Sequence, residues 1–319
     1  MKSIAGGVWP TMVTPFTVSN EIDYDALERA IEWYIHKGVD GLFAVCQSSE
    51  MFVLSLEERV GLAAFVKEKA AGRIPVIASG HIADQYEDQV IELRAMADTG
   101  IDALVLITNR LASENESDAV WIRNLERLLK EIPEDIALGF YECPYPYKRI
   151  ISPELLKWSA ETGRFHFLKD TSCDISNMKA KLEAVKGTAL NIYNANSATL
   201  LETLKLGVTG YSGVMANFHP ELYVWLMRNW AENTVEAEHV SNFLSIASLI
   251  ERQLYPVNAK YHLMLEDVFT TDYCRSKNHR EFTATNQLEV QQLHRLSQSV
   301  LRCSINGIHQ AKLSGAAGT

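Results

Sequence analysis

The sequence predicts an α/β protein, namely a (β/α)8 TIM barrel with a C-terminal helical extension. A short apolar run, a polar corner and an amphipathic stretch alternate eight times between Val8 and Asn233, which is typical of βα units around a parallel sheet. The apolar runs show little alternation, as strands covered on both faces should. A doubly wound open sheet would share this rhythm, but neither GxGxxG nor GxxxxGKS/T follows a predicted strand.

The eight predicted strands are rich in valine, isoleucine, leucine and phenylalanine. In chain order they cover residues 8–13, 41–45, 75–79, 103–107, 137–141, 165–169, 190–194 and 211–216. The segments between them carry apolar residues at spacings of three and four, which predicts amphipathic helices. Glycines that can cap a helix in the left-handed conformation end several of these segments, at Gly38, Gly72, Gly100 and Gly207.

The strand pattern stops after an eighth helical segment at residues 219–233, and a helical pattern continues beyond it. A barrel of this class commonly occupies about 250 residues as one domain. We therefore expect residues 1–233 to form the catalytic barrel and residues 234–305 to form a helical extension. Residues 306–319, which end in small and polar residues, are expected to form a disordered tail.

Composition and charge exclude several classes of protein. The chain has 319 residues, 47% of them hydrophobic, and a formal net charge of -10, so nucleic acid is not an expected partner. No stretch approaches the roughly 20 apolar residues of a membrane span, and the amino terminus lacks a signal peptide, so no membrane partner is expected. Five cysteines without a CxxC pair fit reduced thiols in a cytoplasmic protein.

Two residues at strand ends carry the strongest chemical signal, because catalytic groups of such barrels lie where strands end and βα loops begin. Lys169 ends the sixth predicted strand, where apolar surroundings lower the pKa of an amine and let it attack a ketone to form an imine. Tyr141 ends the fifth strand and can shuttle protons in the same pocket. The alternatives are a Lys169 that reaches solvent or pairs with Asp170, and a Tyr141 that is merely a buried aromatic residue.

Polar residues near other strand ends are candidates for binding the substrate. The loop after the second strand precedes a helix, so its hydroxyls and backbone N–H groups predict a nest for a carboxylate; a polar corner with turn-forming serines is the alternative. The predicted substrate-binding set is Gln47, Ser48, Ser49, Thr171, Asn196 and Ser212.

Metal binding is not expected at these strand ends. Cys46, Cys143 and Cys173 each follow a strand and, with His81, suggest a metal at first sight. No pair among them has the spacing of metal ligands, and a buried cysteine is more often a small hydrophobic residue. The prediction is therefore an enzyme without a metal or another cofactor.

With these positions identified, the chain resembles the dihydrodipicolinate synthase and N-acetylneuraminate lyase family of pyruvate-type Schiff-base enzymes over about residues 4 to 300. The resemblance rests on Thr14-Pro15-Phe16 with Ile22-Asp23, Ser48-Ser49-Glu50 with residues 54–59, Tyr141 with Pro144, Leu168-Lys169-Asp170, and Gly207 with Gly210, Asn217 and Pro220. It implies that Lys169 forms the imine, that Tyr141 relays protons, and that Ser48 matches the carboxylate-binding threonine. It also implies a homo-oligomer, a tetramer or a dimer.

The chain departs from this family where the second substrate binds. The family usually has Gly-Thr-Thr-Gly-Glu or Gly-Ser-Thr-Gly-Glu at positions 46–50, and here Gln47 cannot relay a proton as a hydroxyl does. Synthases of the lysine pathway typically carry an arginine at the position of Pro146 and a tyrosine within residues 108–111, and both are missing. We therefore expect no genuine lysine-pathway synthase. Arg110 and Arg149 are candidates for holding a different acidic or polyhydroxylated partner.

Three functions remain open at this stage. The first is a Schiff-base lyase or aldolase that acts on pyruvate or a related 2-oxo acid. The second is a 2-keto-3-deoxy sugar acid dehydratase or aldolase, which the same imine would support. The third, from another class, is a non-catalytic sugar-acid-binding protein, whose expected mark would be loss of Lys169 or Tyr141, and both are present.

Overall fold

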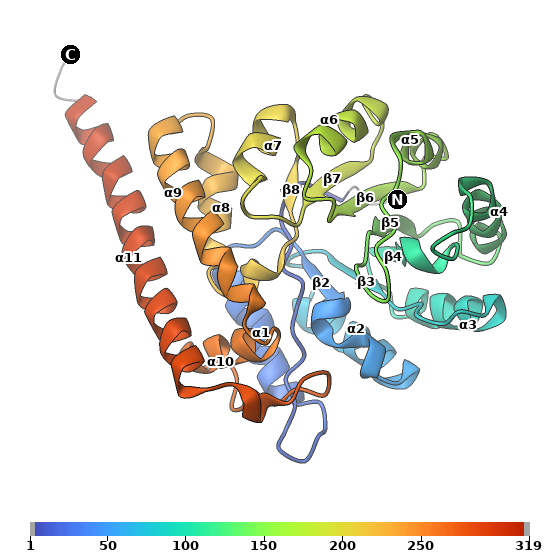
Figure 1. Cartoon of the computed structure of the whole chain (residues 1–319), viewed down its shortest axis with the longest axis horizontal. Helices are drawn as coiled ribbons and strands as arrows, with labels where there is room; N and C mark the ends of the chain where they lie inside the picture. The colour runs from blue at the N-terminus through green and yellow to red at the C-terminus, as the bar shows by residue number, and fades with distance from the viewer. Residues whose placement is uncertain (1–3, 316–319) are drawn as a thin grey trace.

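The structure, a computed structural model, describes residues 4–315, with side chains described for residues 4–304. Eight parallel strands lie side by side in the order β1-β8-β7-β6-β5-β4-β3-β2, with helices around the outside (Figure 1). The strands are β1 Gly7–Val8, β2 Leu42–Val45, β3 Val76–Ser79, β4 Ala103–Ile107, β5 Ala137–Tyr141, β6 Phe165–Asp170, β7 Asn191–Asn194 and β8 Gly210–Tyr211.

The sheet closes into a barrel where the segment that follows β1 pairs with β2. Thr11 and Phe43 form a parallel bridge, in which the Met12 N–H donates to the Phe43 carbonyl at 3.1 Å and the Phe43 N–H donates to the Pro10 carbonyl at 3.0 Å. Pro10 has no N–H to offer a neighbouring strand, so regular pairing of β1 is short. The predicted (β/α)8 barrel is thus confirmed.

Aromatic side chains fill the inside of the barrel. The ring of Trp9 lies 5.9 Å from the rings of both Phe167 and Tyr193, and the Phe43 ring lies 5.8 Å from the Tyr141 ring. Gly41 makes room for this packing, since a Cβ at that position would lie 2.5 Å from the Trp9 ring. The interior is therefore a packed core, and only its carboxyl end is open to a ligand.

The helices between the strands begin where the sequence offers caps. They are α1 Tyr24–His36, α2 Leu56–Ala70, α3 Tyr86–Ala97, α4 Asp118–Leu129, α5 Pro153–Glu161, α6 Ile175–Ala184, α7 Leu200–Leu206 and α8 Pro220–Asn229. Asp23 accepts a hydrogen bond from the Ala26 N–H at the start of α1, and Ser55 forms a reciprocal capping box with Glu58 at the start of α2. Such caps satisfy N–H groups that have no partner within the helix.

The eighth strand is shorter than the pattern of residues 211–216 predicts. Only Gly210–Tyr211 pair as β8, and Val214–Asn217 form a 3-10 helix, η4. The chain turns away from the sheet because the Ser212 hydroxyl donates to the Trp9 carbonyl at 2.9 Å, and the Asn217 amide donates to the Val214 carbonyl at 2.9 Å. An apolar run alone does not reveal such side-chain bonds to the backbone.

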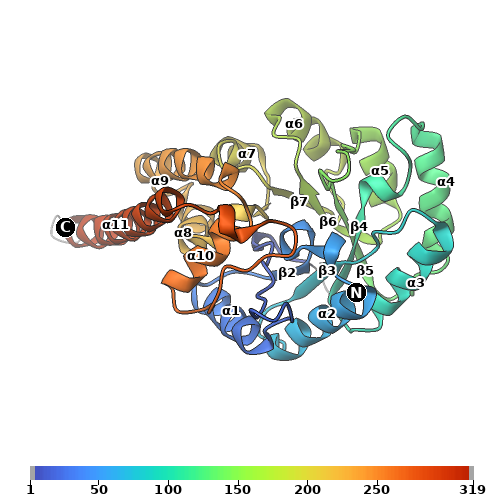
Figure 2. The ribbon, with the colours of Figure 1, turned by 60° about the horizontal axis from the view of Figure 1, so that its bottom comes forward.

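The C-terminal extension contains three helices and two 3-10 turns. They are α9 Thr234–Ala247, η5 Ser248–Arg252, α10 Val257–Leu265, η6 His279–Glu281 and α11 Ala284–Gly315. Figure 2 shows that the chain between α10 and α11 passes close to α1 and the end of the barrel. Helix α11 continues to Gly315, whereas a disordered tail from residue 306 was expected; residues 316–319 lie outside the described part. No helix in the described part of the chain is long and apolar enough to span a membrane.

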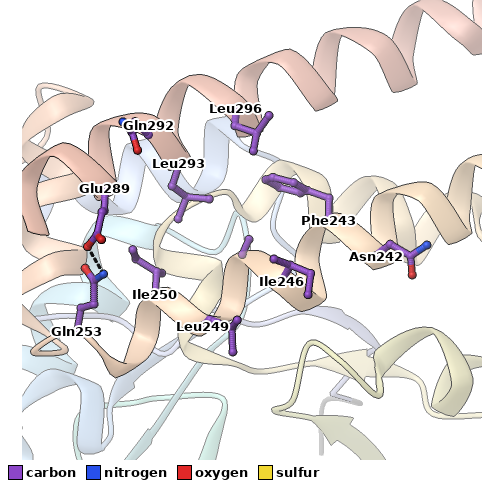
Figure 3. A pocket seen from close by; sticks show the side chains of 11 residues that line it. Asn242, Phe243, Ile246, Leu249, Ile250, Gln253, Glu289, Gln292, Leu293 and Leu296 are labelled. Atoms are coloured by element: carbon purple, nitrogen blue, oxygen red, sulfur yellow. Dashed lines mark hydrogen bonds between the residues drawn. The ribbon is translucent and has the colours of Figure 1, made fainter.

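An apolar groove of about 470 Å³ separates α11 from α9 and η5 (Figure 3). Its walls include Phe243, Ile246, Leu249, Leu293 and Leu296. At one end the Gln253 amide donates to the Glu289 carboxylate, which joins the two sides. The groove lies within the extension and contains none of the residues predicted to bind substrate.

Candidate active site

A cavity of about 540 Å³ lies at the carboxyl end of the barrel. It brings together the ends of β5 and β6, the loop after β2 and the segment that joins η5 to α10. Of the predicted site residues, Lys169, Tyr141, Gln47, Ser48 and Thr171 line this cavity.

Lys169 projects into the cavity from β6, next to Tyr141 on β5. The two residues are in register across the strand pair, and the Lys169 Nζ lies 4.7 Å from the centre of the Tyr141 ring and 6.0 Å from that of Phe43. Burial lowers the pKa of Lys169 to about 8, although the nearby Cys46, Cys143 and Glu251 oppose this shift. Lys169 forms no ion pair with any described carboxylate, and at a pKa of about 8 roughly one amine in eleven is neutral at pH 7.

The carboxylate next to Lys169 in sequence has a different partner. Asp170 and Glu142 both bind Lys181 of α6, whose Nζ lies 2.6 Å from each carboxylate. All three side chains are buried. The alternative prediction that Lys169 pairs with Asp170 is therefore wrong.

Glu142 also fixes the end of β6. Its Oε2 accepts the Thr171 N–H at 2.9 Å, and the Thr171 hydroxyl donates to the Glu142 carbonyl at 2.6 Å. Burial, reinforced by the charge of Asp170, raises the pKa of Glu142 to about 7, while Lys181 opposes the shift. The backbone just after Lys169 is thus held by buried hydrogen bonds.

Tyr141 keeps its phenol neutral in this setting. Burial raises its pKa well above the ordinary value, and the neighbouring Cys143 and Cys46 act in the same direction. A neutral phenol beside a neutral amine can donate a proton to an oxygen that becomes negative and can then take one back. The position supports the role that the sequence predicted, which stays a proposal.

The loop after β2 forms the 3-10 turn η1 Gln47–Ser49. Ser48 faces the cavity, and its hydroxyl lies 3.2 Å from that of Thr11. Gln47 accepts a weak hydrogen bond from the Cys143 thiol at 3.4 Å. Ser49 points away from the cavity, since its hydroxyl donates to the Cys46 carbonyl at 2.7 Å and accepts the Cys46 N–H at 2.9 Å.

Two other predicted binding residues do not line the cavity. The Asn196 side chain caps a turn by accepting the Thr199 N–H at 3.1 Å, and its amide contacts the Cys173 thiol at 3.4 Å. Ser212 is fully buried and donates to a backbone carbonyl of the first strand region. Both residues have structural bonds that their place near a strand end did not reveal.

The C-terminal extension supplies residues that sequence reasoning did not assign to the site. Glu251, Tyr255, Arg275 and Lys277 all line the cavity. The sequence carries no local signal for them, because they reach the barrel only through long-range packing. Tyr255 contacts the site through Ser48, and Glu251 is close enough to Lys169 for each to influence the pKa of the other.

A buried ion pair holds this extension against the barrel. The Lys260 Nζ lies 2.5 Å from the Glu50 carboxylate, which also accepts the backbone N–H groups of Arg275 at 2.8 Å and Ser276 at 2.6 Å. The Arg275 guanidinium pairs with Glu58 at 2.8 Å. Glu50 thus belongs to the support of the cavity wall.

The two arginines proposed for a second partner lie elsewhere. Arg110 pairs with Asp84, and Arg149 donates to the Ser113 carbonyl at 2.9 Å and to Asp118 at 3.0 Å. Neither lines the cavity. The positive charges at its mouth are those of Arg275 and Lys277 instead.

One group in the described part of the chain has the composition of a metal site, and it lies outside the cavity. His262, Glu266 and His294 offer ligand atoms within 4.8 Å of one another. The Lys37 ammonium lies 3.3 Å from the Glu266 carboxylate and already supplies a positive charge there. All five cysteines are free, and the strand-end thiols form no such group with His81 among the described residues.

The fold and cavity define a class, a (β/α)8 barrel with a buried lysine at the mouth. Residues 5–295 match the Dihydrodipicolinate synthetase family. The chain therefore belongs to this family of aldolases and lyases.

Two relatives illustrate the range of this family. A 4-hydroxy-tetrahydrodipicolinate synthase of Staphylococcus epidermidis is 25% identical over 258 residues, which cover 81% of this chain and 85% of that protein. The putative 2-dehydro-3-deoxy-D-gluconate aldolase YagE of Escherichia coli is 28% identical over 238 residues, which cover 72% of this chain and 75% of that protein.

Solved structures of the family share the fold. The chloride-inhibited dihydrodipicolinate synthase from Acinetobacter baumannii, complexed with pyruvate, aligns with a TM-score of 0.82 at 21% identity, covering 92% of this chain and 99% of that one. CdNal from Clostridium difficile, in complex with mannosamine, aligns with a TM-score of 0.81 at 18% identity and the same coverage. At such identities the likeness concerns the fold alone.

Proposed function

We propose that the protein is a Schiff-base-forming lyase that acts on pyruvate or a related 2-oxo acid, with Lys169 as the nucleophile. The observation that carries this proposal is the buried amine of Lys169 at the wall of a cavity of about 540 Å³, where no carboxylate among the described residues pairs with it. Desolvation favours the neutral amine, and the neutral amine is the form that attacks a carbonyl.

The neighbouring residues suit the steps of imine formation. The Lys169 nitrogen bonds to the keto carbon while the oxygen takes a proton, which gives a carbinolamine. Loss of the hydroxyl as water, with a proton supplied by Tyr141, then gives the imine. The imine withdraws electrons from the adjacent carbon, so that a bond there breaks with its electrons held as an enamine, or forms from that enamine. Ser48 supplies a hydroxyl to the carboxylate of the 2-oxo acid.

For the second partner we propose a hydroxylated aldehyde, so that the product is a 2-keto-3-deoxy sugar acid. Glu251 lines the cavity, where its carboxylate can accept hydrogen bonds from hydroxyl groups and repels a second carboxylate. Pro146 offers no positive charge at the position where a lysine-pathway synthase has arginine. The relative YagE is described as a putative aldolase for 2-dehydro-3-deoxy-D-gluconate, which supports the same class. Dehydration of such a sugar acid would use the same Lys169 and Tyr141.

Covalent trapping tests the mechanism directly. Incubation with pyruvate and borohydride should reduce the imine to a stable secondary amine, and peptide mass mapping should place one adduct on Lys169. Lys169→Ala should abolish trapping, whereas Lys205→Ala, which removes an exposed lysine of α7 paired with Glu202, should not change it. Tyr141→Phe should slow trapping by about 10²–10⁴ because general acid–base help is lost.

An adduct on another lysine would refute the assignment of the nucleophile. If no 2-oxo acid gave an adduct, the non-catalytic sugar-acid-binding function would become the leading hypothesis. Release of pyruvate from 2-keto-3-deoxy sugar acids, followed with a coupled assay, would separate aldol cleavage from dehydration, because dehydration retains all carbon atoms in one product.

A further inference from the structure

The segment between η5 and α10 brings a phenol to the cavity wall. Tyr255 lies in this segment and lines the same cavity as Lys169, Tyr141 and Ser48. We propose that Tyr255 is a substrate-binding residue whose hydroxyl, together with that of Ser48, donates a hydrogen bond to the carboxylate of the 2-oxo acid. This inference rests on the proposed function and adds a residue to its binding site.

The hydrogen bonds around Tyr255 fix the direction of its proton. The Tyr255 oxygen lies 3.1 Å from the Asn217 Nδ2, whose two protons are taken by the Thr11 and Val214 carbonyls at 2.9 Å each. Because carbonyls only accept, these contacts place the amide nitrogen on this side. The Asn217 oxygen in turn accepts the Tyr34 hydroxyl proton.

Because an amide nitrogen cannot accept a hydrogen bond, the Tyr255 proton does not go to Asn217 and is left for another partner. The neighbour on the cavity side is Ser48, whose hydroxyl donates toward the phenol oxygen and so does not take its proton. Ser48 and Tyr255 thus present two hydroxyls at one place on the wall. Two adjacent donors are the arrangement that binds a carboxylate, which has two accepting oxygens.

Burial keeps Tyr255 in the donating form. It raises the pKa of the phenol well above the ordinary value, an effect that the hydrogen bond from Ser48 partly opposes. A neutral phenol in a desolvated wall forms a stronger hydrogen bond to an anion than to a neutral acceptor.

The test compares a charged ketone with a neutral one. Pyruvate carries a carboxylate, and methyl pyruvate carries a neutral ester that accepts only weaker hydrogen bonds. In Tyr255→Phe the concentration of pyruvate that gives half-maximal borohydride trapping should rise about 10- to 100-fold, as expected for loss of a hydrogen bond to a charged group. The corresponding concentration of methyl pyruvate should change less than threefold.

Tyr261→Phe is the matched control. It removes a phenol from α10, in the same extension, whose oxygen accepts the Gln291 amide at 2.7 Å, and it should leave both ketones unaffected. Tyr255→Met is a second variant in case the phenylalanine variant is poorly folded, as judged by circular dichroism and thermal melting, and it should show the same preference for the ester.

The outcomes separate this inference from the proposed function. If the wild-type protein traps neither ketone, the proposed function fails. If the wild type traps pyruvate and Tyr255→Phe traps it at unchanged concentrations, the phenol does not bind the carboxylate and the inference is overturned. Equal losses with pyruvate and methyl pyruvate would also overturn it, since they would show an effect on imine formation itself.

Discussion

The pH dependence of imine formation should report the burial of Lys169. With the pKa lowered to about 8, about one amine in eleven is neutral at pH 7, compared with about one in 2500 at the reference pKa of about 10.4. Burial thus raises the amount of nucleophile about 200-fold at pH 7. As pH rises, the trapping rate should increase with a midpoint near pH 8 and level off above about pH 9, where the amine is mostly neutral.

Substitution of Glu251 should shift the pKa of Lys169 in a known direction. Its negative charge stabilises the ammonium form of Lys169 and so opposes the lowering by burial. Glu251→Gln removes that charge, so the midpoint of the pH profile should move to lower pH. Glu183→Gln, which changes an exposed carboxylate on α6, should leave the midpoint in place.

The assay measures the initial rate of trapping at low pyruvate concentration from pH 6 to 10. Each rate is divided by the rate at which borohydride traps the imine of a small-molecule amine at the same pH, which corrects for the pH dependence of the reagent. A midpoint near 10 in the wild type would mean that the Lys169 amine is solvated, and the argument from burial would be wrong. A shift of the Glu251→Gln midpoint to higher pH would contradict the assigned sign.

Three further predictions concern stability and specificity. Lys181→Met leaves two buried carboxylates unpaired and should lower the free energy of unfolding by about 3–5 kcal/mol, measured with urea, whereas Lys186→Met on the surface should have little effect. Burial lowers the pKa of His81 and His219 to about 3, so below pH 6.5 the unfolded chain binds more protons than the folded protein. The free energy of unfolding should therefore fall by about 1.4 kcal/mol per pH unit for each ring. His219→Phe should reduce this slope in thermal melts at acid pH. Pro146 cannot bind a carboxylate, so a coupled assay should show poor conversion of pyruvate with aspartate semialdehyde. Turnover within about tenfold of a genuine lysine-pathway synthase would contradict this expectation.

The barrel could be predicted from sequence because its signals are local. Each strand is a short apolar run with a turn at its end, and each helix repeats apolar residues at its own period, so the elements could be ordered without knowing any contact. The prediction was wrong where one contact decides the structure. Residues 214–216 are apolar and were predicted as the end of a strand, but the bonds of Asn217 help to turn this segment into a 3-10 helix.

The site was predictable only in part, for a related reason. The rule that strand ends face the mouth of a barrel placed Lys169 and Tyr141 at the cavity, and the structure has both on its wall. The same rule failed for Asn196 and Ser212, whose side chains turn to nearby backbone groups. It could not find Tyr255, because the fold brings that residue to Ser48 from a segment about 200 positions later in the chain.

Strand alternation explains why the amine of Lys169 stays unpaired although Asp170 follows it. Successive side chains of a strand point to opposite faces, so when Lys169 and Tyr141 face the inside of the barrel, Asp170 and Glu142 face the helices. There Lys181 of α6 lies 2.6 Å from both carboxylates and neutralises charge that would otherwise be left buried. Lys181 thus supplies the positive charge that both carboxylates need, and neither of them takes Lys169 as its partner. The buried charges behind the wall therefore help to keep the nucleophile free in front of it.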